Sequence, residues 1–260
     1  MIDFITYSAQ NVYGFSLVLI RLSGLCVVAP IYGGEQVPRL VRALFALVFT
    51  IVIYPALDLS FSTLPSSPVE YLIIVLKELV LGLIIGFLAT AIFFGFQMGG
   101  RYISIHMGMS MGRTLDPFSN QQTTVIGQIF NFVVIGVFLV LNAHHFILEA
   151  IYESFVLIPP ATVVFTTVIF DHAIKTFNVV VWTSLKIALP TMAALFSINL
   201  VFAFISRLVP RMNVFILSLP AKIGSGIIIT TVALPAMIYL FVSVIEQVFT
   251  DINLILHAFS

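Results

Sequence analysis

The chain is poor in charged residues and nearly lacks cysteine. Lys, Arg, Asp and Glu together make up 8% of its 260 residues, whereas a soluble domain carries about 25%. This scarcity excludes an ordinary soluble protein. The eleven basic residues balance the eleven acidic ones and are dispersed along the chain, so no basic surface for nucleic acid is expected. The single cysteine, Cys26, cannot form a disulfide within the chain.

The motifs of common catalytic and metal sites are also missing. The sequence contains no P-loop and no HExxH pair. The adjacent His144 and His145 lack a cluster of Cys or carboxylate ligands at metal-binding spacing. Around Ser225 the full GxSxG pattern is absent. We therefore expect no catalytic residues, no metal and no cofactor.

Apolar residues dominate the composition. They make up 60% of the chain, and the mean hydropathy is +1.16. A membrane-spanning helix needs about 20 mostly apolar residues, and six segments approach or exceed that length: 12–32, 40–57, 71–96, 125–141, 178–205 and 214–248. Residues 161–170 are apolar but too short to cross. We predict an all-α integral membrane protein of about six long, kinked hydrophobic helices in hairpins.

The positive residues predict an orientation for these spans. Alternate inter-span loops carry pairs of arginines, which are Arg39 with Arg42, Arg101 with Arg113, and Arg207 with Arg211. The loop between the second and third spans has no Lys or Arg. Because basic loops stay in the cytoplasm, the arginine-bearing loops should face it, with both termini outside.

A few charges interrupt the apolar segments and should lie at membrane depth or inside an assembly. They are Arg21, Lys77, Glu78, Lys186 and Lys222, and we predict that they form a buried charge network. A central Arg or Lys costs about 2.5–3.5 kcal/mol on insertion, so each should face a polar cavity, pair with an acid or extend to the interface. Structural pairing and a proton or substrate pathway both remain open.

Glycine and proline residues occur within the long apolar segments. Gly82 with Gly86, and Gly95 with Gly99, are spaced four apart, which places each pair on one helix face and predicts close packing against a neighbouring helix. The last segment is longer than one crossing needs and is interrupted by Pro220, Gly224, Gly226 and Pro235. We expect strong tilt or a break in it.

The central stretch, residues 97–124, differs from its apolar flanks. Met107, Met109 and Met111 alternate with small or polar residues that include Gly108 and Gly112, a period of two rather than of a helix. Methionine adapts to irregular partners and glycine frees the backbone, so we expect an extended or mobile segment. A lid, a plug, a binding loop and a plain connector are all compatible with this pattern.

One stretch resembles a known family. Residues 206–222 read SRLVPRMNVFILSLPAK and resemble the SR-x-x-PQMNVF…LP-x-K signature of the FliR family, the type III export gate subunits of the bacterial flagellum, whose counterparts serve virulence injectisomes. Arg211 stands where the family has Gln. Further landmarks follow in family order along nearly the whole chain: Arg21, Pro30, Pro38, Arg42, Lys77, Glu78, Asp116, Pro117, Asn142, His144, His145, Ser154 and Pro159.

The resemblance implies an architecture and partners. FliR-like subunits assemble with FliP and FliQ into a helical gate that sits largely above the bilayer in the basal body, with FlhB around its base and FlhA nearby. One export-gate domain would span residues 1–260. Residues 1–176 would be FliP-like, and residues 177–260 would form a FliQ-like hairpin. Unfolded flagellar proteins would pass through the gate in the bacterial inner membrane.

The resemblance also implies roles for particular residues. The loop at about 97–124 would plug the closed pore, with Met107, Met109, Met111, Gly108, Gly112, Asp116 and Pro117 as its seal and turn residues. A turn at the cytoplasmic entrance would contain Arg207, Pro210, Arg211 and Asn213. The alternatives are a virulence secretion subunit, a small-solute secondary transporter, which would need matching broken helices in two halves, and an intramembrane enzyme, for which no nucleophile–base pair is evident.

Overall fold

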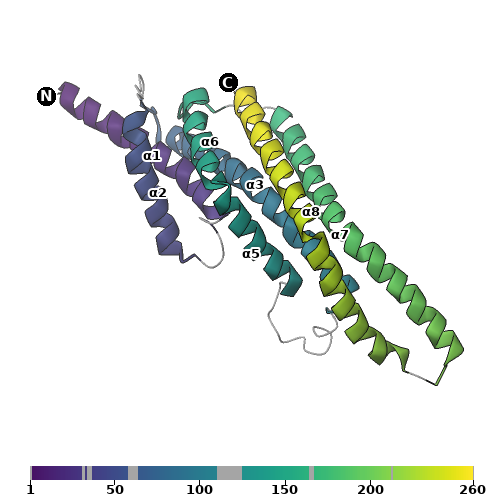
Figure 1. The fold of residues 1–260 in the computed structure, drawn as a ribbon. Helices are drawn as coiled ribbons and strands as arrows, with labels where there is room; N and C mark the ends of the chain where they lie inside the picture. The colour runs from purple at the N-terminus through teal and green to yellow at the C-terminus, as the bar shows by residue number, and fades with distance from the viewer. Residues whose placement is uncertain are drawn as a thin grey trace. The chain divides into compact units, whose positions relative to one another are not determined.

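The structure, a computed structural model, describes residues 2–30, 33, 37–57, 64–109, 125–163, 167–211 and 213–259. Every regular element in these residues is a helix (Figure 1). In chain order they are α1 (Ile2–Val28), α2 (Arg39–Ile53), the short η1 (Tyr54–Ala56), α3 (Pro68–His106), α5 (Val125–Val140), α6 (Ala143–Leu157), α7 (Thr167–Leu208) and α8 (Val214–Phe259). Five of the described helices are long and apolar enough to cross a membrane, and α5 with α6 would make a sixth span. The predicted all-α membrane fold is confirmed.

The helix ends follow local sequence signals. At the start of α3 the Ser67 hydroxyl accepts the Glu70 N–H at 3.2 Å, and the Glu70 carboxylate accepts the N–H of Ser66 at 2.7 Å. These bonds satisfy amides that the first helical turn leaves free, and Pro68 suits the first helical position. After Leu157, the pair Pro159–Pro160 prevents α6 from continuing, as the sequence predicts.

The chain divides into two compact units. The first contains residues 1–91, 142–176 and 247–260, and the second contains residues 92–141 and 177–246. In the first unit α1 packs against α2 and against the N-terminal half of α3. In the second unit α7 and α8 run antiparallel, and they pack with α5 and the C-terminal part of α3.

The glycine pairs of α3 pack against neighbouring helices in both units, as predicted. A Cβ atom built on Gly82 would overlap the carbonyl oxygen of Arg21 in α1, and one on Gly86 would lie 3.0 Å from the Leu25 oxygen. In the second unit, a Cβ on Gly99 would lie 3.1 Å from the Ser184 oxygen of α7. Only glycine allows backbones to approach this closely, so α3 is a central helix of each unit.

Several helix boundaries differ from the sequence prediction. The irregular central stretch does not begin at Gln97, because α3 continues through His106. The glycines at 99 and 100 permit close helix packing there rather than loop motion, since a Cβ on Gly100 would meet Gly127 of α5 at 2.9 Å. Helix α7 begins at Thr167 rather than near residue 178. The last segment, for which strong tilt or a break was predicted, is one unbroken helix, α8, with Pro220 and Pro235 inside it.

Aromatic side chains build the core of the second unit. Phe93 and Phe96 of α3 meet Phe241 of α8 with ring centroids 6.0 and 4.8 Å apart, and Phe93 also meets Phe138 of α5 at 5.1 Å. All three pairs are edge-to-face, a favourable arrangement for aromatic rings. All four rings are buried, so they tie α3, α5 and α8 together.

Candidate functional site

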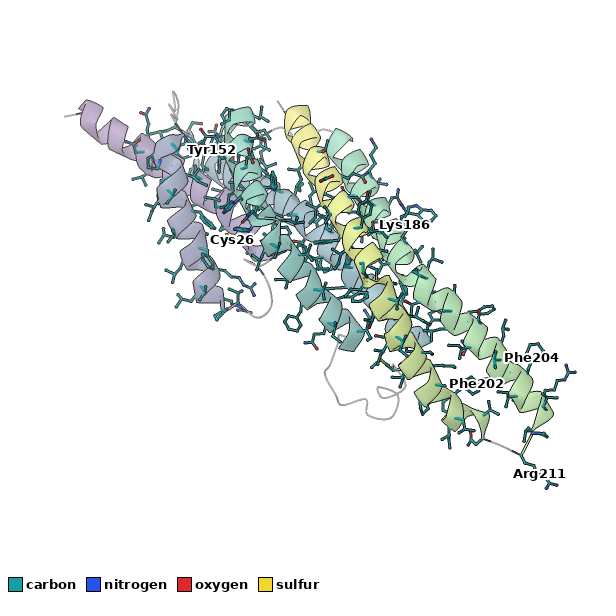
Figure 2. All side chains as sticks on the ribbon, viewed as in Figure 1. Cys26, Tyr152, Lys186, Phe202, Phe204 and Arg211 are labelled. Carbon is teal, nitrogen blue, oxygen red and sulfur yellow. The ribbon has the colours of Figure 1, made fainter. Side chains whose placement is uncertain are left out.

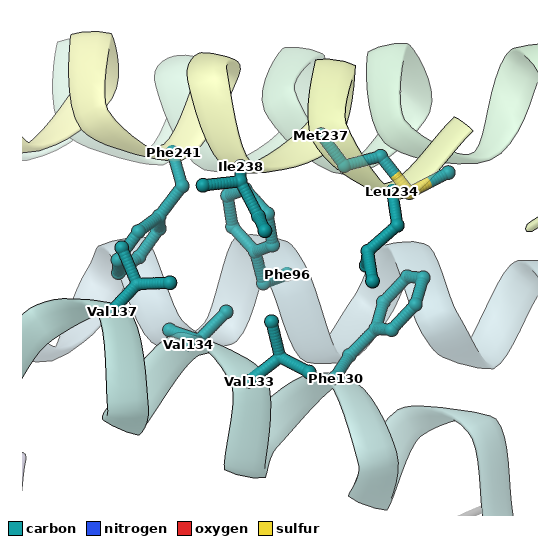
Figure 3. Close-up of a pocket in the computed structure, with 9 residues that line it drawn as sticks. All are labelled: Phe96, Phe130, Val133, Val134, Val137, Leu234, Met237, Ile238 and Phe241. Carbon is teal, nitrogen blue, oxygen red and sulfur yellow. The ribbon is translucent and has the colours of Figure 1, made fainter. Parts of the chain in front are cut away.

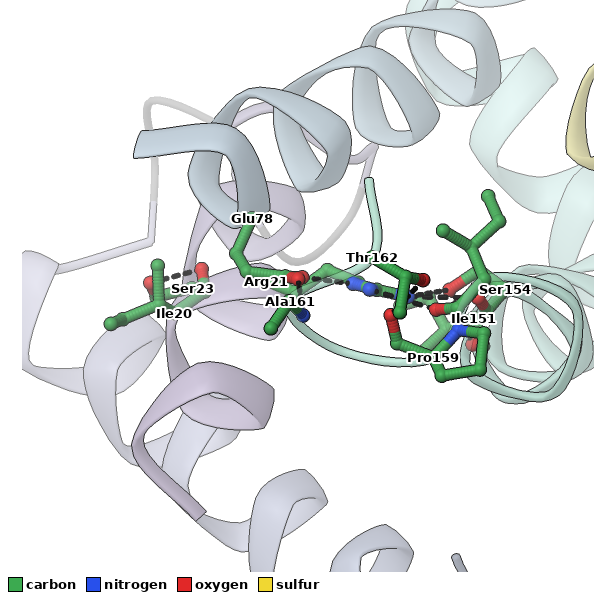
Figure 4. A network of polar contacts seen from close by, with 10 residues as sticks. Ile20, Arg21, Ser23, Glu78, Ile151, Ser154, Pro159, Ala161 and Thr162 are labelled. Carbon is green, nitrogen blue, oxygen red and sulfur yellow. Dashed lines mark hydrogen bonds and ion pairs between the residues drawn. The ribbon is translucent and has the colours of Figure 1, made fainter. Parts of the chain in front are cut away.

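A buried ion pair joins α1 to α3 in the first unit. Arg21 Nε donates to Glu78 Oε2 at 2.6 Å, and the two side chains are 1% and 0% exposed (Figure 4). Helix α1 presents Arg21 and α3 presents Glu78 where Gly82 lets the two backbones touch. A charge buried this completely is tolerated only with a partner. Of the two readings that the sequence left open, this geometry favours structural pairing.

The guanidinium of Arg21 makes further contacts with α6 and the residue that follows it. Its Nη1 donates to the carbonyl oxygen of Ser154 at 2.8 Å, and its Nη2 donates to the carbonyl oxygen of Ile158 at 3.0 Å. Both acceptors lie at the C-terminal end of α6, and the Ser154 carbonyl also accepts the backbone N–H of Ile158 at 3.1 Å. The guanidinium also stands 4.3 Å from the ring centre of Phe155, within range of a cation–π attraction. Arg21 therefore caps α6.

Glu78 extends the network to the turn that follows α6. Its Oε1 accepts the backbone N–H of Ala161 at 2.8 Å. Ala161 has φ +73°, a left-handed conformation that disfavours residues other than glycine. The ion pair thus holds a strained turn in place, and one cluster connects α1, α3, α6 and the segment after α6 (Figure 4).

The other three predicted members of the charge network are not part of it. Lys186 on α7 is exposed, and Lys77 and Lys222 are half-buried. Within the described residues none of the three forms an ion pair with an acidic side chain. In the single chain the described part of this network therefore consists of Arg21 and Glu78, and a wider network within an assembly stays a prediction. Adjacent positions such as Lys77 and Glu78 point about 100° apart on a helix, so only Glu78 reaches Arg21.

The start of the Met-rich stretch is anchored in the second unit. Met107 directly follows α3 and is fully buried. It lies on Gly226 of α8, where a built Cβ would come within 2.6 Å of the Met107 Cε atom. Gly108 has φ +83°, a turn conformation that glycine adopts without strain. Met109 is half-buried.

The remaining predicted plug residues, Met111, Gly112, Asp116 and Pro117, lie outside the described residues. Met107 was expected to be a seal residue, and in the single chain it is buried against Gly226 at the start of the stretch. The sequence alone could not predict that Met107 packs against Gly226 of α8, because the two residues are far apart in the chain.

A short turn joins α7 to α8 at the residues predicted to form the entrance turn. Arg207, Pro210, Arg211 and Asn213 are all exposed there. The Asn213 side-chain oxygen accepts the Ile216 N–H at 3.4 Å, a capping contact at the start of α8. Figure 2 shows Arg211 at the tip of this hairpin. Two arginines and no acidic residue thus mark the turn.

An apolar hollow that sequence reasoning missed lies in the second unit, among α3, α5 and α8 (Figure 3). Its empty volume is about 250 Å³, and no polar side chain lines it. The lining residues are Phe96, Phe130, Val133, Val134, Val137, Leu234, Met237, Ile238 and Phe241. Such a hollow offers no group for chemistry.

His144 and His145 meet each other rather than a metal cluster. Their ring centres are 4.2 Å apart. Within the part of the chain that the structure describes, no three His, Cys, Asp or Glu side chains converge as metal ligands would. The preceding Asn142 has φ +53°, which turns the chain between α5 and α6.

Comparison with known proteins gives consistent matches over nearly the whole chain. Residues 12–248 match the family described as bacterial export proteins, family 1. The chain is 32% identical over 225 residues to the flagellar biosynthetic protein FliR of Bacillus subtilis (strain 168), covering 85% of each chain. It is 24% identical over 234 residues to the FliR protein of Escherichia coli (strain K12), covering 90% of this chain and 87% of that one. It is also 28% identical over 215 residues to the Yop proteins translocation protein T of Yersinia pestis, covering 80% of each.

Proposed function

The chain belongs to the bacterial export proteins, family 1, and we propose that it serves as the FliR-type subunit of a flagellar type III export gate. The match over residues 12–248 carries this proposal. The similarity to flagellar FliR proteins over 85–90% of the chain supports the flagellar role. The family is described as export proteins, and one matching relative is named a translocation protein.

The gate is a hetero-oligomer with FliP and FliQ, and FlhB and FlhA adjoin it in the bacterial inner membrane. Helix dimensions support this assembly. Helices α7 and α8 contain 42 and 46 residues, so they are about 63 and 69 Å long, about twice the hydrocarbon thickness of a bilayer. Their apolar faces are largely exposed in the single chain. Exposed apolar surface beyond the lipid is stable only when other subunits cover it.

Residues 110–124, between the anchored Met107 and α5, form the pore plug. An export pore must pass unfolded proteins of any sequence yet retain ions when idle. Methionine side chains form a deformable apolar seal, and an apolar constriction stops ions by excluding water. Met107, buried against Gly226, fixes the base of the plug.

A deletion tests the plug. Removal of residues 110–120, which leaves Met107 and Met109 in place, should raise the ion permeability of cells that contain the assembled gate. The matched control exchanges residues 110–120 for an equally long Gly/Ser segment, which keeps the connection but removes the apolar seal, and it should leak as well. Unchanged permeability in both variants, with the gate assembled at normal amounts, would contradict the plug.

A second candidate is the equivalent subunit of a virulence type III secretion system. The 28% identity to the Yop translocation protein T favours it. Complementation separates the two: restored swimming in a flagellar strain that lacks FliR supports the flagellar role, whereas restored effector secretion alone supports the virulence role.

A further inference from the structure

Helix α5 is apolar on every side, so hydrophobicity does not determine which of its faces packs against α3. Of its 16 residues, only Gln128 and Asn131 have polar side chains. Attraction between apolar side chains is not directional, and it therefore allows several rotations and offsets of α5 along α3. A polar contact between two helices can select one of them, at a cost in stability.

Asn131 makes such a contact with Gln97 of α3. The Nε2 atom of Gln97 donates to the Oδ1 atom of Asn131 at 2.7 Å, and both side chains are half-buried. About one helical turn away, Gly100 of α3 meets Gly127 of α5, because a Cβ built on Gly100 would lie 2.9 Å from the Gly127 Cα. The glycines allow the two helices to approach closely, and the amide pair adds a directional bond.

These contacts define the register of an antiparallel helix pair. They follow in opposite order along the two helices, since the Phe93 ring meets Phe138 before Gln97 meets Asn131. A displacement of α5 by one helical turn would move it about 5.4 Å along α3. The two amides would then lie too far apart for a hydrogen bond, and a residue with a side chain would stand opposite Gly100.

The register of this pair determines where the segment that joins the two helices is attached. Helix α3 ends at His106, and α5 begins at Val125. We propose that Gln97 and Asn131 are positioning residues whose hydrogen bond holds α5 in one register on α3 and thereby fixes both attachment points of the pore plug. This inference rests on the proposed plug, residues 110–124, and names the pair that keeps it in place.

A contact that selects a register differs from a stabilising contact in the effect of its removal. Replacing both amides by apolar side chains leaves no polar group unpaired, so the free energy of unfolding should be unchanged or higher. The single register should nevertheless be lost, as it is when the one polar residue of a coiled-coil interface is removed. A purely stabilising contact predicts the reverse, which is lower stability with an unchanged register.

Distances between spin labels test the register in the purified full-length chain. The labels are attached to Ile105→Cys on α3 and Leu139→Cys on α5, two exposed positions, in a Cys26→Ala background that removes the one native thiol. Double electron–electron resonance should give one narrow distance distribution with the native amides. Gln97→Leu with Asn131→Leu should broaden it or add a population displaced by about 5 Å, one helical turn. An unchanged narrow distribution would overturn the proposal.

Two further variants are matched controls for the spin-label experiment. Gln97→Asn with Asn131→Gln exchanges the two amides, which can still form the hydrogen bond, and this variant should restore the single narrow distribution. Gln128→Leu removes the other amide of α5, which is exposed, and should leave the distribution narrow. If the exchanged pair gives a distribution as broad as the Leu pair, or if Gln128→Leu broadens it equally, the hydrogen bond does not select the register.

Ion permeability tests the effect of the register on the plug. Cells whose assembled gate carries Gln97→Leu with Asn131→Leu should leak ions several-fold more than cells with the same amount of unmodified gate, and the exchanged pair should not leak. The 110–120 deletion, measured in parallel, separates the two claims. A leaky deletion beside a tight Leu pair would overturn the positioning role and leave the plug intact. A tight deletion would contradict the plug and with it the positioning role, while the spin-label distances would still decide the register.

Discussion

Separating Arg21 from its carboxylate should destabilise the chain far more than an equivalent change on the surface. Glu78→Gln keeps the size of the side chain and an acceptor for the Ala161 N–H, but leaves the Arg21 charge buried with only neutral partners. The guanidinium is 1% exposed, so it cannot recover hydration. Loss of one member of a buried ion pair costs about 3–5 kcal/mol, and we expect that loss in the free energy of unfolding.

The measurement is denaturant unfolding of the purified chain in detergent, followed by circular dichroism. Glu149→Gln on α6 is the matched control, because Glu149 is exposed, and the same chemical change there should stay within about 0.5 kcal/mol. Adding Arg21→Met to Glu78→Gln removes the stranded charge. The double variant should therefore lose less stability than the two single variants lose together. We expect the difference to be about 3 kcal/mol, the upper end of the interaction energies of contacting residues.

Two results would refute this reasoning. One is a Glu78→Gln variant as stable as Glu149→Gln, which would mean that Arg21 finds water or another acid. The other is simple additivity in the double variant, which would mean that Arg21 and Glu78 act independently.

The close glycine contacts yield two further predictions, each measured as a free energy of unfolding. Gly82→Ala should destabilise the chain by more than about 2 kcal/mol, because the new methyl group meets backbone, whereas Gly136→Ala, with nothing within 4 Å, should be neutral or stabilising by up to about 1 kcal/mol. Gly226→Ala should displace Met107 and lower the free energy of unfolding by about 1–3 kcal/mol. Gly224 lies two residues away on α8, and a Cβ atom there would meet nothing within 4 Å. Gly224→Ala should therefore leave the free energy of unfolding unchanged or raise it. Equal effects within either pair would contradict the packing described.

The sequence predicted the helices and the glycine contacts on α3 well, because hydrophobic run length and four-residue spacing are local signals. It also identified Arg21 and Glu78 as charges that require an explanation. It did not predict that the two pair with each other, since 57 positions separate them and only the fold brings them together.

Other features of the site were misread for the same reason. The central stretch was expected to be irregular from residue 97, but Gly99 and Gly100 lie in α3 and contact α7 and α5. A glycine that gives a loop its flexibility and a glycine that permits close helix packing look the same in a sequence, and only the neighbouring residues distinguish them. Lys186 was assigned to a buried network because it interrupts an apolar run, yet its helix face is exposed. Hydropathy along a chain does not distinguish a face covered by lipid from one covered by protein.

The central claim, that this chain is an export gate subunit, is tested most directly by co-expressing it with FliP and FliQ and measuring the detergent-extracted complex by native mass spectrometry. The account predicts one discrete hetero-oligomer that contains all three chains. A stable monomer or homodimer of this chain, with FliP and FliQ assembling without it, would contradict the account.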